Sequence, residues 1–496
     1  MPVVIASGLT ARHQRSWPFK MESLQQWRST DNFEAQMADL KTNFAGISSP
    51  NPFWLASAPP SNSGHQVHKA FEAGWGGVVW KTIGAPVLNV SNRYGAWHHG
   101  GQKMLGINNV ELISDRPLED NLREISEIKR AWPDRAVIVS AMVESTPEAW
   151  REIVHRIEDA GADGIELNYG CPHGMSERGM GSAVGQVPEY CEQITQWVTN
   201  VAKIPVLVKL TPNVANIVGP ARAAIAGGAH GISLINTLNS ITGIDLDTFE
   251  ISPNIGGKGG HGGYAGPAVK PIALNMLASV ANDESIRASG VPISGMGGIS
   301  NWSDAAEFLA LGATSLQVCT AVMHYGFRII ADLCDGLSNW MDAKEIKSIE
   351  EFRGRSLHRL STFQDLDLNF KAVARIDPDK CIKCNLCYIA CNDTAHQCID
   401  LVSVTGQIVS PGLDFQSSGK QAAIDGRPTP MVRESDCVGC RLCYNVCPVE
   451  SCIDMVEVPS GRQPKTWAEL SNELPEVSHD WNAMKRYREA NGIRIH

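Results

Sequence analysis

Residues 164–186 read GIELNYGCPHGMSERGMGSAVGQ, a short apolar run followed by a cysteine and a glycine-rich loop. The run 164–168 predicts a buried strand with Asn168 at its carboxyl end. Cys171 then lies just beyond the carboxyl end of the strand, which is where parallel α/β folds have their active sites. Because glycine permits backbone conformations that other residues resist, we expect this loop to act as a lid that carries a reactive thiol to a ligand. An inert loop cysteine is the alternative for a single Cys.

Seven further apolar runs alternate with amphipathic stretches, which is typical of βα units and a parallel sheet. Together the eight predicted strands are 53–57, 77–81, 136–141, 164–168, 205–210, 231–236, 292–295 and 315–319. The predicted helices are 68–73, 117–131, 147–160, 189–201, 221–226, 268–281, 303–311 and 327–341. Eight such units predict an α/β fold with a closed (β/α)8 barrel, and a doubly wound open sheet is the alternative.

Composition limits the classes of protein to which the chain can belong. It has 496 residues, of which 43% are hydrophobic and 19% charged, so we expect more than one globular domain. The formal net charge of -10 and the lack of any basic run argue against a nucleic-acid partner. No apolar stretch reaches the roughly 18 residues that a membrane span needs, and no signal peptide opens the chain. We therefore expect a cytoplasmic protein.

Polar or glycine residues stand at the carboxyl ends of the predicted strands. After the last two strands come Gly297 with Gly298 and Cys319 with Thr320. Barrel phosphate sites are built from these two loops, so the pattern predicts a phosphorylated cofactor. Lys209 ends an apolar strand and would cost several kcal/mol if it were buried without a partner, so it needs an anionic or electron-rich neighbour. A rim lysine paired with a carboxylate is the alternative.

The two longest loops of the predicted barrel are 82–116 and 237–267, and long loops on this face usually cover substrate. Residues 257–262, GKGGHG, match the spacing of a dinucleotide-binding glycine motif. That motif belongs in the tight turn between a strand and its helix, whereas these glycines lie within a long loop. We interpret them as part of a flexible lid, and we find no other nicotinamide motif.

Eight of the 14 cysteines fall in two runs near the carboxyl terminus, each with the spacing C-x2-C-x2-C-x3-C. This spacing specifies a bacterial-type ferredoxin with two [4Fe-4S] clusters, in which the fourth cysteine of each run ligates the other cluster. Zinc explains pairs of cysteines but not two runs of four. Cys398 and Cys452 are extra, and we interpret them as buried small residues. The predicted ligand sets are Cys381, Cys384, Cys387 and Cys447 for one cluster, and Cys437, Cys440, Cys443 and Cys391 for the other.

On these features the chain resembles dihydropyrimidine dehydrogenases, which are related to dihydroorotate dehydrogenases. That family's pattern Asn-Leu-Ser-Cys-Pro-His-Gly-Met corresponds to residues 168–175, with departures at Tyr169 and Gly170. The resemblance covers about residues 40–460 and is greatest to the smaller bacterial subunit type, which lacks the nicotinamide-binding part. It implies that Asn109, Asn168, Asn236 and Thr237 hold a pyrimidine. It also implies that FMN is held by Ala56, Ser57, Lys81, Thr82, Lys209, Gly266, Gly297, Gly298, Cys319 and Thr320.

The resemblance further implies reversible reduction of uracil or thymine, in which FMN delivers a hydride to C6 and Cys171 gives a proton to C5. Electrons would come through the clusters from a partner flavoprotein that carries FAD and binds NAD(H), in a hetero-oligomer. A dihydroorotate dehydrogenase with a fused ferredoxin is one alternative, but no obvious cation for an orotate carboxylate lies near Asn109 or Asn236. An electron-transfer subunit with a non-catalytic barrel is the other.

These assignments predict five segments. They are an N-terminal extension over 1–40, a flavin-binding barrel over 41–345, a linker over 346–372, a ferredoxin domain over 373–460 and a tail over 461–496. We also expect a short helix over 22–27, a hairpin within 399–433, and docking residues in the tail at Trp467, Trp481 and Tyr487.

Overall fold

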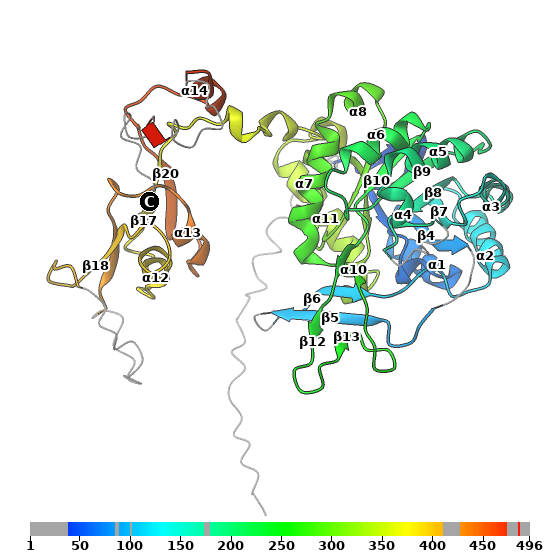
Figure 1. The fold of residues 1–496 in the computed structure, drawn as a ribbon, viewed down its shortest axis with the longest axis horizontal. Helices are drawn as coiled ribbons and strands as arrows, with labels where there is room; N and C mark the ends of the chain where they lie inside the picture. Colours follow the sequence, from blue (N-terminus) through cyan, green and yellow to red (C-terminus); the bar gives the residue numbers. More distant parts are fainter. Residues whose placement is uncertain are drawn as a thin grey trace, which may run out of the picture. The chain divides into compact units, whose positions relative to one another are not determined.

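The computed structural model describes residues 38–84, 89–99, 102–172, 179–409, 427–473 and 485–486. The helix predicted over 22–27 and the predicted docking residues Trp481 and Tyr487 lie outside these ranges. The chain divides into two compact units, Met1–His358 and Arg359–His496, each drawn in Figure 1. The division falls within the segment predicted as a linker, 346–372.

Eight parallel strands of the first unit close into a barrel in the order β10-β15-β16-β3-β4-β7-β8-β9 (Figure 1). The predicted (β/α)8 barrel is confirmed, and the eight predicted strands are the eight strands of the barrel. Their bounds are β3 (Phe53–Leu55), β4 (Gly77–Gly84), β7 (Ala136–Met142), β8 (Gly164–Tyr169), β9 (Val206–Leu210), β10 (Gly231–Leu234), β15 (Ile293–Met296) and β16 (Ala313–Val318).

Helices surround the barrel and pack one apolar face each against it. In α3 the buried residues Trp150, Ile153, Val154 and Ile157 form that face, and the Thr146 side chain caps the first turn by accepting a hydrogen bond from the Ala149 N–H. The surrounding helices are α1 (Gly64–Ala73), α2 (Leu118–Ala131), α3 (Pro147–Asp159), α5 (Pro188–Thr199), α6 (Val218–Ala226), α7 (Lys270–Ala281), α9 (Trp302–Ala310) and α11 (Ile329–Ala343), with the shorter α4 (Ser182–Gly185), α8 (Glu284–Ser289) and α10 (Thr320–Tyr325).

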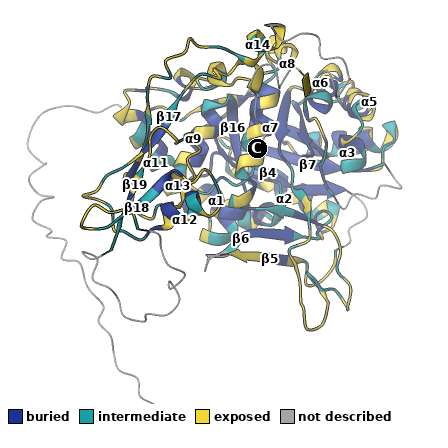
Figure 2. Cartoon of the chain, turned by 60° about the vertical axis from the view of Figure 1, so that its left-hand side comes forward, coloured by how far each residue is buried: buried dark blue, intermediate teal, exposed yellow. Residues whose placement is uncertain are grey.

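Alternation along the strands divides the barrel into an outer and an inner set of side chains. In β9, Val206 and Val208 pack in the main core that the helices share, whereas Leu207 belongs to a separate inner cluster. Phe44 and Ile47, on the hairpin of β1 (Thr42–Phe44) and β2 (Ile47–Ser49), join this inner cluster. The hairpin therefore closes the amino-terminal end of the barrel, and Figure 2 shows the barrel strands buried.

A four-stranded antiparallel sheet occupies the two long loops. Its order is β11-β14-β6-β5, with bounds β11 (Leu238–Ser240), β14 (Gly262–Ala265), β6 (Gln102–Asn109) and β5 (Tyr94–His99). A Cβ added at Gly262 would lie 1.9 Å from Asn108 Oδ1, and one at Gly263 would lie 2.2 Å from Thr237 Oγ1. Gly262 and Gly263, in the loop interpreted as a flexible lid, therefore lie in a strand and allow its close pairing. A small pair, β12 (Gly243–Ile244) and β13 (Ile251–Ser252), extends the same loop.

The first part of the predicted linker belongs to the barrel unit. Ile346, Ile349 and Phe352 are buried in the barrel's main hydrophobic core. Trp340 of α11 meets the Phe352 ring edge-on at a centroid distance of 5.2 Å. Residues beyond His358 belong to the second unit.

The second unit contains two short helices and two antiparallel strand pairs. β17 (Ala372–Ile376) pairs with β20 (Ile453–Glu457), and β18 (Ile399–Val402) pairs with β19 (Thr429–Val432). Residues 410–426 of the predicted hairpin lie outside the described part. The helix α12 (Leu386–Asn392) contains the last two cysteines of the first run. The helix α13 (Leu442–Val446) contains the third cysteine of the second run and ends directly before the fourth. A further helix, α14 (Trp467–Glu473), contacts the turn at Phe363. No described helix is both long and apolar enough to cross a membrane.

Candidate active site and cluster cavities

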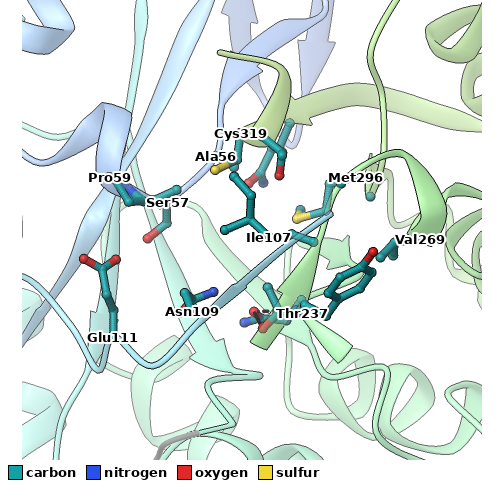
Figure 3. Close-up of a pocket in the computed structure, with 18 of the residues that line it drawn as sticks. Ala56, Ser57, Pro59, Ile107, Asn109, Glu111, Thr237, Val269, Met296 and Cys319 are labelled. Carbon is teal, nitrogen blue, oxygen red and sulfur yellow. Dashed lines mark hydrogen bonds between the residues drawn. The ribbon is translucent and has the colours of Figure 1, made fainter. Parts of the chain in front are cut away.

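One cavity opens at the carboxyl ends of the barrel strands, with about 1200 Å³ of empty space counted to its open mouth. Figure 3 shows Ser57, Asn109, Thr237 and Cys319 around this space, on separate elements of the barrel unit. All of the barrel residues proposed from the sequence for catalysis, substrate or flavin line this cavity. They are Cys171, Asn109, Asn168, Asn236, Thr237, Ala56, Ser57, Lys81, Thr82, Lys209, Gly266, Gly297, Gly298, Cys319 and Thr320.

A chain of hydrogen bonds fixes the amide side chains of the cavity. Asn236 Nδ2 donates to Asn168 Oδ1 at 3.1 Å, and Asn168 Nδ2 donates to Thr82 Oγ1 at 3.0 Å. Asn109 Nδ2 donates to the Gly263 carbonyl oxygen at 2.9 Å. Each of these amide nitrogens carries two N–H groups. One donor on each residue therefore remains for a ligand.

Cys171 lies in the cavity wall at the end of β8. Its side chain is buried among Ile113, Met142 and Met180, and its Sγ donates to the Leu112 carbonyl oxygen at 3.5 Å. Residues 173–178 of the predicted lid lie outside the described part.

The two departures from the family's pattern have physical reasons. A Cβ added at Gly170 would lie 2.4 Å from the Cβ of Asn236, so glycine here makes room for that amide. Tyr169 is buried and its hydroxyl lies 3.2 Å from Thr195 Oγ1 on α5, away from the cavity.

Three glycines form a tight backbone cradle on the other side of the cavity. Gly266, Gly297 and Gly298 have φ values of 122°, 123° and 82°. An added Cβ at Gly297 would lie 2.7 Å from the Ala273 Cβ, and one at Gly298 would lie 2.9 Å from the Gly266 carbonyl oxygen. The conformation and the close packing both require glycine, so bare backbone faces the cavity here. Such a surface fits a phosphate, which backbone N–H groups bind.

Lys209 lies in the cavity wall with a carboxylate behind it. Its Nζ is 3.9 Å from Glu166 Oε1, and Glu166 is fully buried. Gln317 Nε2 donates to Glu166 Oε2 at 2.8 Å, whereas Glu166 Oε1 and Gln317 Oε1 have no hydrogen-bond partner among the described protein groups. The contact to Glu166 is too long for a hydrogen bond, so the ammonium retains donors for a ligand in the cavity.

Lys81 belongs to a second charged group of the cavity wall. Its Nζ lies 3.0 Å from Glu111 Oε2, and Arg93 Nη1 lies 2.9 Å from Glu111 Oε1. Burial acts to raise the pKa of Glu111, but Lys81, Tyr94 and Arg93 outweigh burial and lower that pKa. Glu111 is therefore a carboxylate that holds Lys81 at the cavity wall.

Glu111→Gln should lower the free energy of unfolding by about 3 kcal/mol at neutral pH, because it leaves the Lys81 ammonium buried without its carboxylate. Since the folded-state pKa of Glu111 is lowered, its contribution is present above the unfolded pKa and is lost as the pH falls through the folded pKa. Urea unfolding of the wild type and of Glu111→Gln at neutral and acidic pH measures the difference in their free energies of unfolding, which should be smaller in acid. An equal difference at both pH values would contradict the assignment. The double variant Lys81→Met/Glu111→Gln should recover part of the loss.

Cys319 contributes a neutral thiol to the cavity. Burial raises the pKa of Cys319 to about 11, although the neighbouring Lys209 ammonium acts to lower it. The Cys319 Sγ lies 3.8 Å from the sulfur of Met323. Cys319 is therefore protonated at neutral pH and forms part of an apolar wall.

Sequence reasoning did not find several residues of this site. Glu166 was detectable, because it lies two positions before Asn168 on the same face of β8. Strand alternation also applies to Gln317, which lies on the same face of β16 as the polar Ser315. Tyr264 lies in β14, and Glu111 lies two residues beyond the end of β6. The pairing of these two strands links distant parts of the chain and leaves no local signal.

The second unit brings the eight cysteines of the two runs to two small cavities. Cys381, Cys384 and Cys387 line one cavity with Cys447, and Cys437, Cys440 and Cys443 line the other with Cys391. Four thiols around each cavity fit an iron-sulfur cluster, and the fourth cysteine of each run lies with the first three of the other. Asn392 follows the last cysteine of the first run, where the second run has Pro448, and it donates through Nδ2 to the Tyr388 hydroxyl at 2.8 Å.

Comparison with known protein families agrees with both units. The family described as dihydroorotate dehydrogenase matches residues 39–341, and the 4Fe-4S dicluster domain matches residues 380–451. The chain is thus a flavin-dependent barrel oxidoreductase with an iron-sulfur domain.

Individual relatives narrow this class. The NAD-dependent dihydropyrimidine dehydrogenase subunit PreA of Escherichia coli is 40% identical over 421 residues, which span 85% of this chain and 96% of that protein. The chloroplastic dihydropyrimidine dehydrogenase (NADP(+)) of Arabidopsis thaliana is 40% identical over 66% of this chain and 79% of its own length. The catalytic subunit of dihydroorotate dehydrogenase B (NAD(+)) of Pyrococcus abyssi is 35% identical over 64% of this chain and 99% of its own length. The chain belongs to the dihydropyrimidine dehydrogenase family and is related to the dihydroorotate dehydrogenases.

Proposed function

We propose that this chain reversibly reduces the C5–C6 double bond of uracil or thymine. The observation that carries the proposal is the joint placement of Cys171 and three amide side chains in the wall of one cavity. A pyrimidine base is uncharged and offers two carbonyl acceptors and two N–H donors. Asn109, Asn168, Asn236 and Thr237 supply matching groups.

The charges of the cavity favour a neutral base over orotate. Among the described lining residues the two lysines already face carboxylates, Lys81 at 3.0 Å and Lys209 at 3.9 Å. Arg93, nearby, contacts both Glu111 and Asp115. A carboxylate on the substrate would therefore compete with Glu111 or Glu166 for its cation.

The proposed cofactor of the barrel is FMN, which when bound supplies the hydride for C6. The glycine cradle and Thr320 would hold its phosphate, and Lys209 would lie beside the electron-rich edge of its ring. Ala56, Ser57, Lys81, Thr82 and Cys319 would enclose the rest. Cys171 would hold the proton for C5 at Sγ, because no other described group in the wall near Asn168 and Asn236 is a comparable acid.

We further propose two [4Fe-4S] clusters in the second unit, held by the two crossed sets of four cysteines. The E. coli relative is named as one subunit of a NAD-dependent enzyme, which supports a partner for this chain. That partner would be a flavoprotein that carries FAD and binds NAD(H), in a cytoplasmic hetero-oligomer.

Dihydroorotate oxidation is the second candidate, and the match to the Pyrococcus abyssi catalytic subunit favours it. The purified chain should reduce uracil with an artificial electron donor and show little activity on orotate under the same conditions. The reverse preference would establish the second candidate instead. Activity on neither substrate, with flavin and iron present, would favour an electron-transfer subunit.

The isolated chain should contain FMN and about eight irons, and it should not oxidise NADH without a partner. Flavin extraction, iron determination and an NADH assay test this expectation. Adding the partner flavoprotein should then start NADH-dependent uracil reduction. Efficient NADH oxidation by the pure single chain would refute the need for a partner.

A further inference from the structure

Each of the two cysteine-lined cavities contains a fifth cysteine that lies outside the C-x2-C-x2-C-x3-C runs. Cys398 lines the cavity that contains Cys391, and Cys452 lines the cavity that contains Cys447. Both side chains are buried, with exposed fractions of 4% and 2%. A small apolar residue would fill such a space equally well, so the contacts of the two thiols decide whether they have a further role.

The two extra thiols occupy corresponding positions. Cys398 Sγ lies 3.5 Å from Cys391 Sγ, and Cys437 lines the same cavity. The Cys398 backbone N–H donates to Cys391 Sγ at 3.4 Å.

Cys452 lines the other cavity together with Cys447 and Cys381. In both cavities the neighbouring pair is the fourth cysteine of one run and the first cysteine of the other. The crossed ligation brings these two to the same cluster.

The direction of the hydrogen bond follows from the ligation. A cysteine that binds iron is a thiolate and has no proton, so it can only accept. Of Cys391 and Cys398, only Cys398 then has an S–H group to donate. A hydrogen bond to a charged acceptor is stronger than one between neutral groups.

We propose that Cys398 and Cys452 are positioning residues whose S–H groups donate to the cluster-ligating sulfurs and thereby raise the reduction potentials of the two clusters. The proposal rests on the cluster ligation proposed above. A reduced cluster carries one more negative charge than the oxidised cluster, so a donor to its sulfur ligands stabilises the reduced form more.

The two thiols should differ in strength. Cys452 Sγ also lies 3.8 Å from the Asp377 carbonyl oxygen, which competes for the same proton. No such carbonyl contact is described for Cys398, whose contact to Cys391 is supported by its own backbone N–H. Removing the Cys398 thiol should therefore have the larger effect.

The test uses the full chain with its clusters assembled, and the readout is the midpoint potential of each cluster in an EPR-monitored redox titration. Cys398→Ala should lower one midpoint, so that at the wild-type midpoint the ratio of reduced to oxidised cluster falls about three- to tenfold, the effect of one hydrogen bond. Cys452→Ala should lower the other midpoint by less. Cys398→Ser, which keeps a donor, should stay near wild type. Cys334→Ala, in the barrel unit, is the matched control and should move neither midpoint.

Iron and sulfide contents separate the possible failures. A wild-type chain without about eight irons would refute the ligation itself, before any variant is compared. If Cys398→Ala loses iron, Cys398→Val is used in its place, because valine fills the space without supplying a donor. Its midpoint is then compared with that of Cys398→Ser. Equal midpoints for the Ser variant and the variant without a donor, in fully loaded proteins, would overturn the proposal. So would shifts of the same cluster by Cys398→Ala and Cys452→Ala.

Discussion

Cys171→Ala should fold, bind flavin and assemble its clusters, yet lose about two or more orders of magnitude in the rate of uracil reduction, the usual size of a general-acid contribution. Reduction of the C5–C6 bond needs a proton beside the hydride. The Cys171 thiol lies in the cavity wall, where its Sγ donates to the Leu112 carbonyl oxygen at 3.5 Å. A thiol is a weak hydrogen-bond donor, so a substrate can replace this acceptor at small cost.

Cys171→Ser should lose nearly as much, because a hydroxyl is a far weaker acid than a thiol. The wild-type rate should also fall as the pH rises and the thiol loses the proton that it has to donate. Single-turnover reduction of uracil by the pre-reduced protein measures the chemical step directly. Near wild-type activity of the Ala variant with an unchanged pH profile would move the role elsewhere, with Glu177, which lies outside the described residues, as the first candidate.

Cys191→Ala is the matched control for Cys171. Cys191 is also a buried barrel cysteine, and its Sγ donates to the Val184 carbonyl oxygen at 3.2 Å. It does not line the cavity. Its loss should lower stability and leave the rate of uracil reduction unchanged, so a comparable loss of rate in both variants would point to packing and not to proton donation.

The barrel was predictable because each parallel strand is covered on both faces and reads as a short apolar run. The strand predicted over 77–81 shows the limit, since β4 continues to Gly84 through the polar Thr82. Thr82 faces the cavity and bonds to Asn168, and a polar residue of this kind interrupts the apolar pattern at the functional end of a strand. The predicted end of this strand is therefore wrong at the point where its side chains begin to line the site.

The antiparallel sheet in the long loops was not predictable from local sequence. β6 and β14 contain residues such as Asn108, Asn109 and Gly263, which are poor strand formers, and their pairing joins segments more than a hundred residues apart in the chain. The cysteine runs, by contrast, specify their chemistry through spacing alone. Of the two carboxylates that face the cavity lysines, only one could be predicted from the sequence. Glu166 follows from strand alternation, whereas the position of Glu111 depends on the sheet in the long loops.

Lys209→Met should reduce flavin content or lower the reduction potential of the bound flavin, with flavin affinity down about tenfold or more. Its ammonium lies in the cavity wall and would stabilise the negative charge that reduction places on the flavin. Flavin content after purification, flavin titration and the midpoint potential of the bound flavin measure the effect.

The interpretation of Lys209→Met depends on the buried carboxylate behind it. Removing the ammonium leaves Glu166 fully buried with Gln317 as its hydrogen-bond donor, and an uncompensated buried charge costs about 3–5 kcal/mol. The single variant would therefore lose stability even if Lys209 never met the flavin. Lys209→Met/Glu166→Gln removes both charges and should regain most of the thermal stability. If Lys209 acts on the flavin, the double variant should still bind flavin weakly or hold it at a lowered potential. Recovery of flavin content and potential along with stability would show instead that Lys209 serves only to neutralise Glu166.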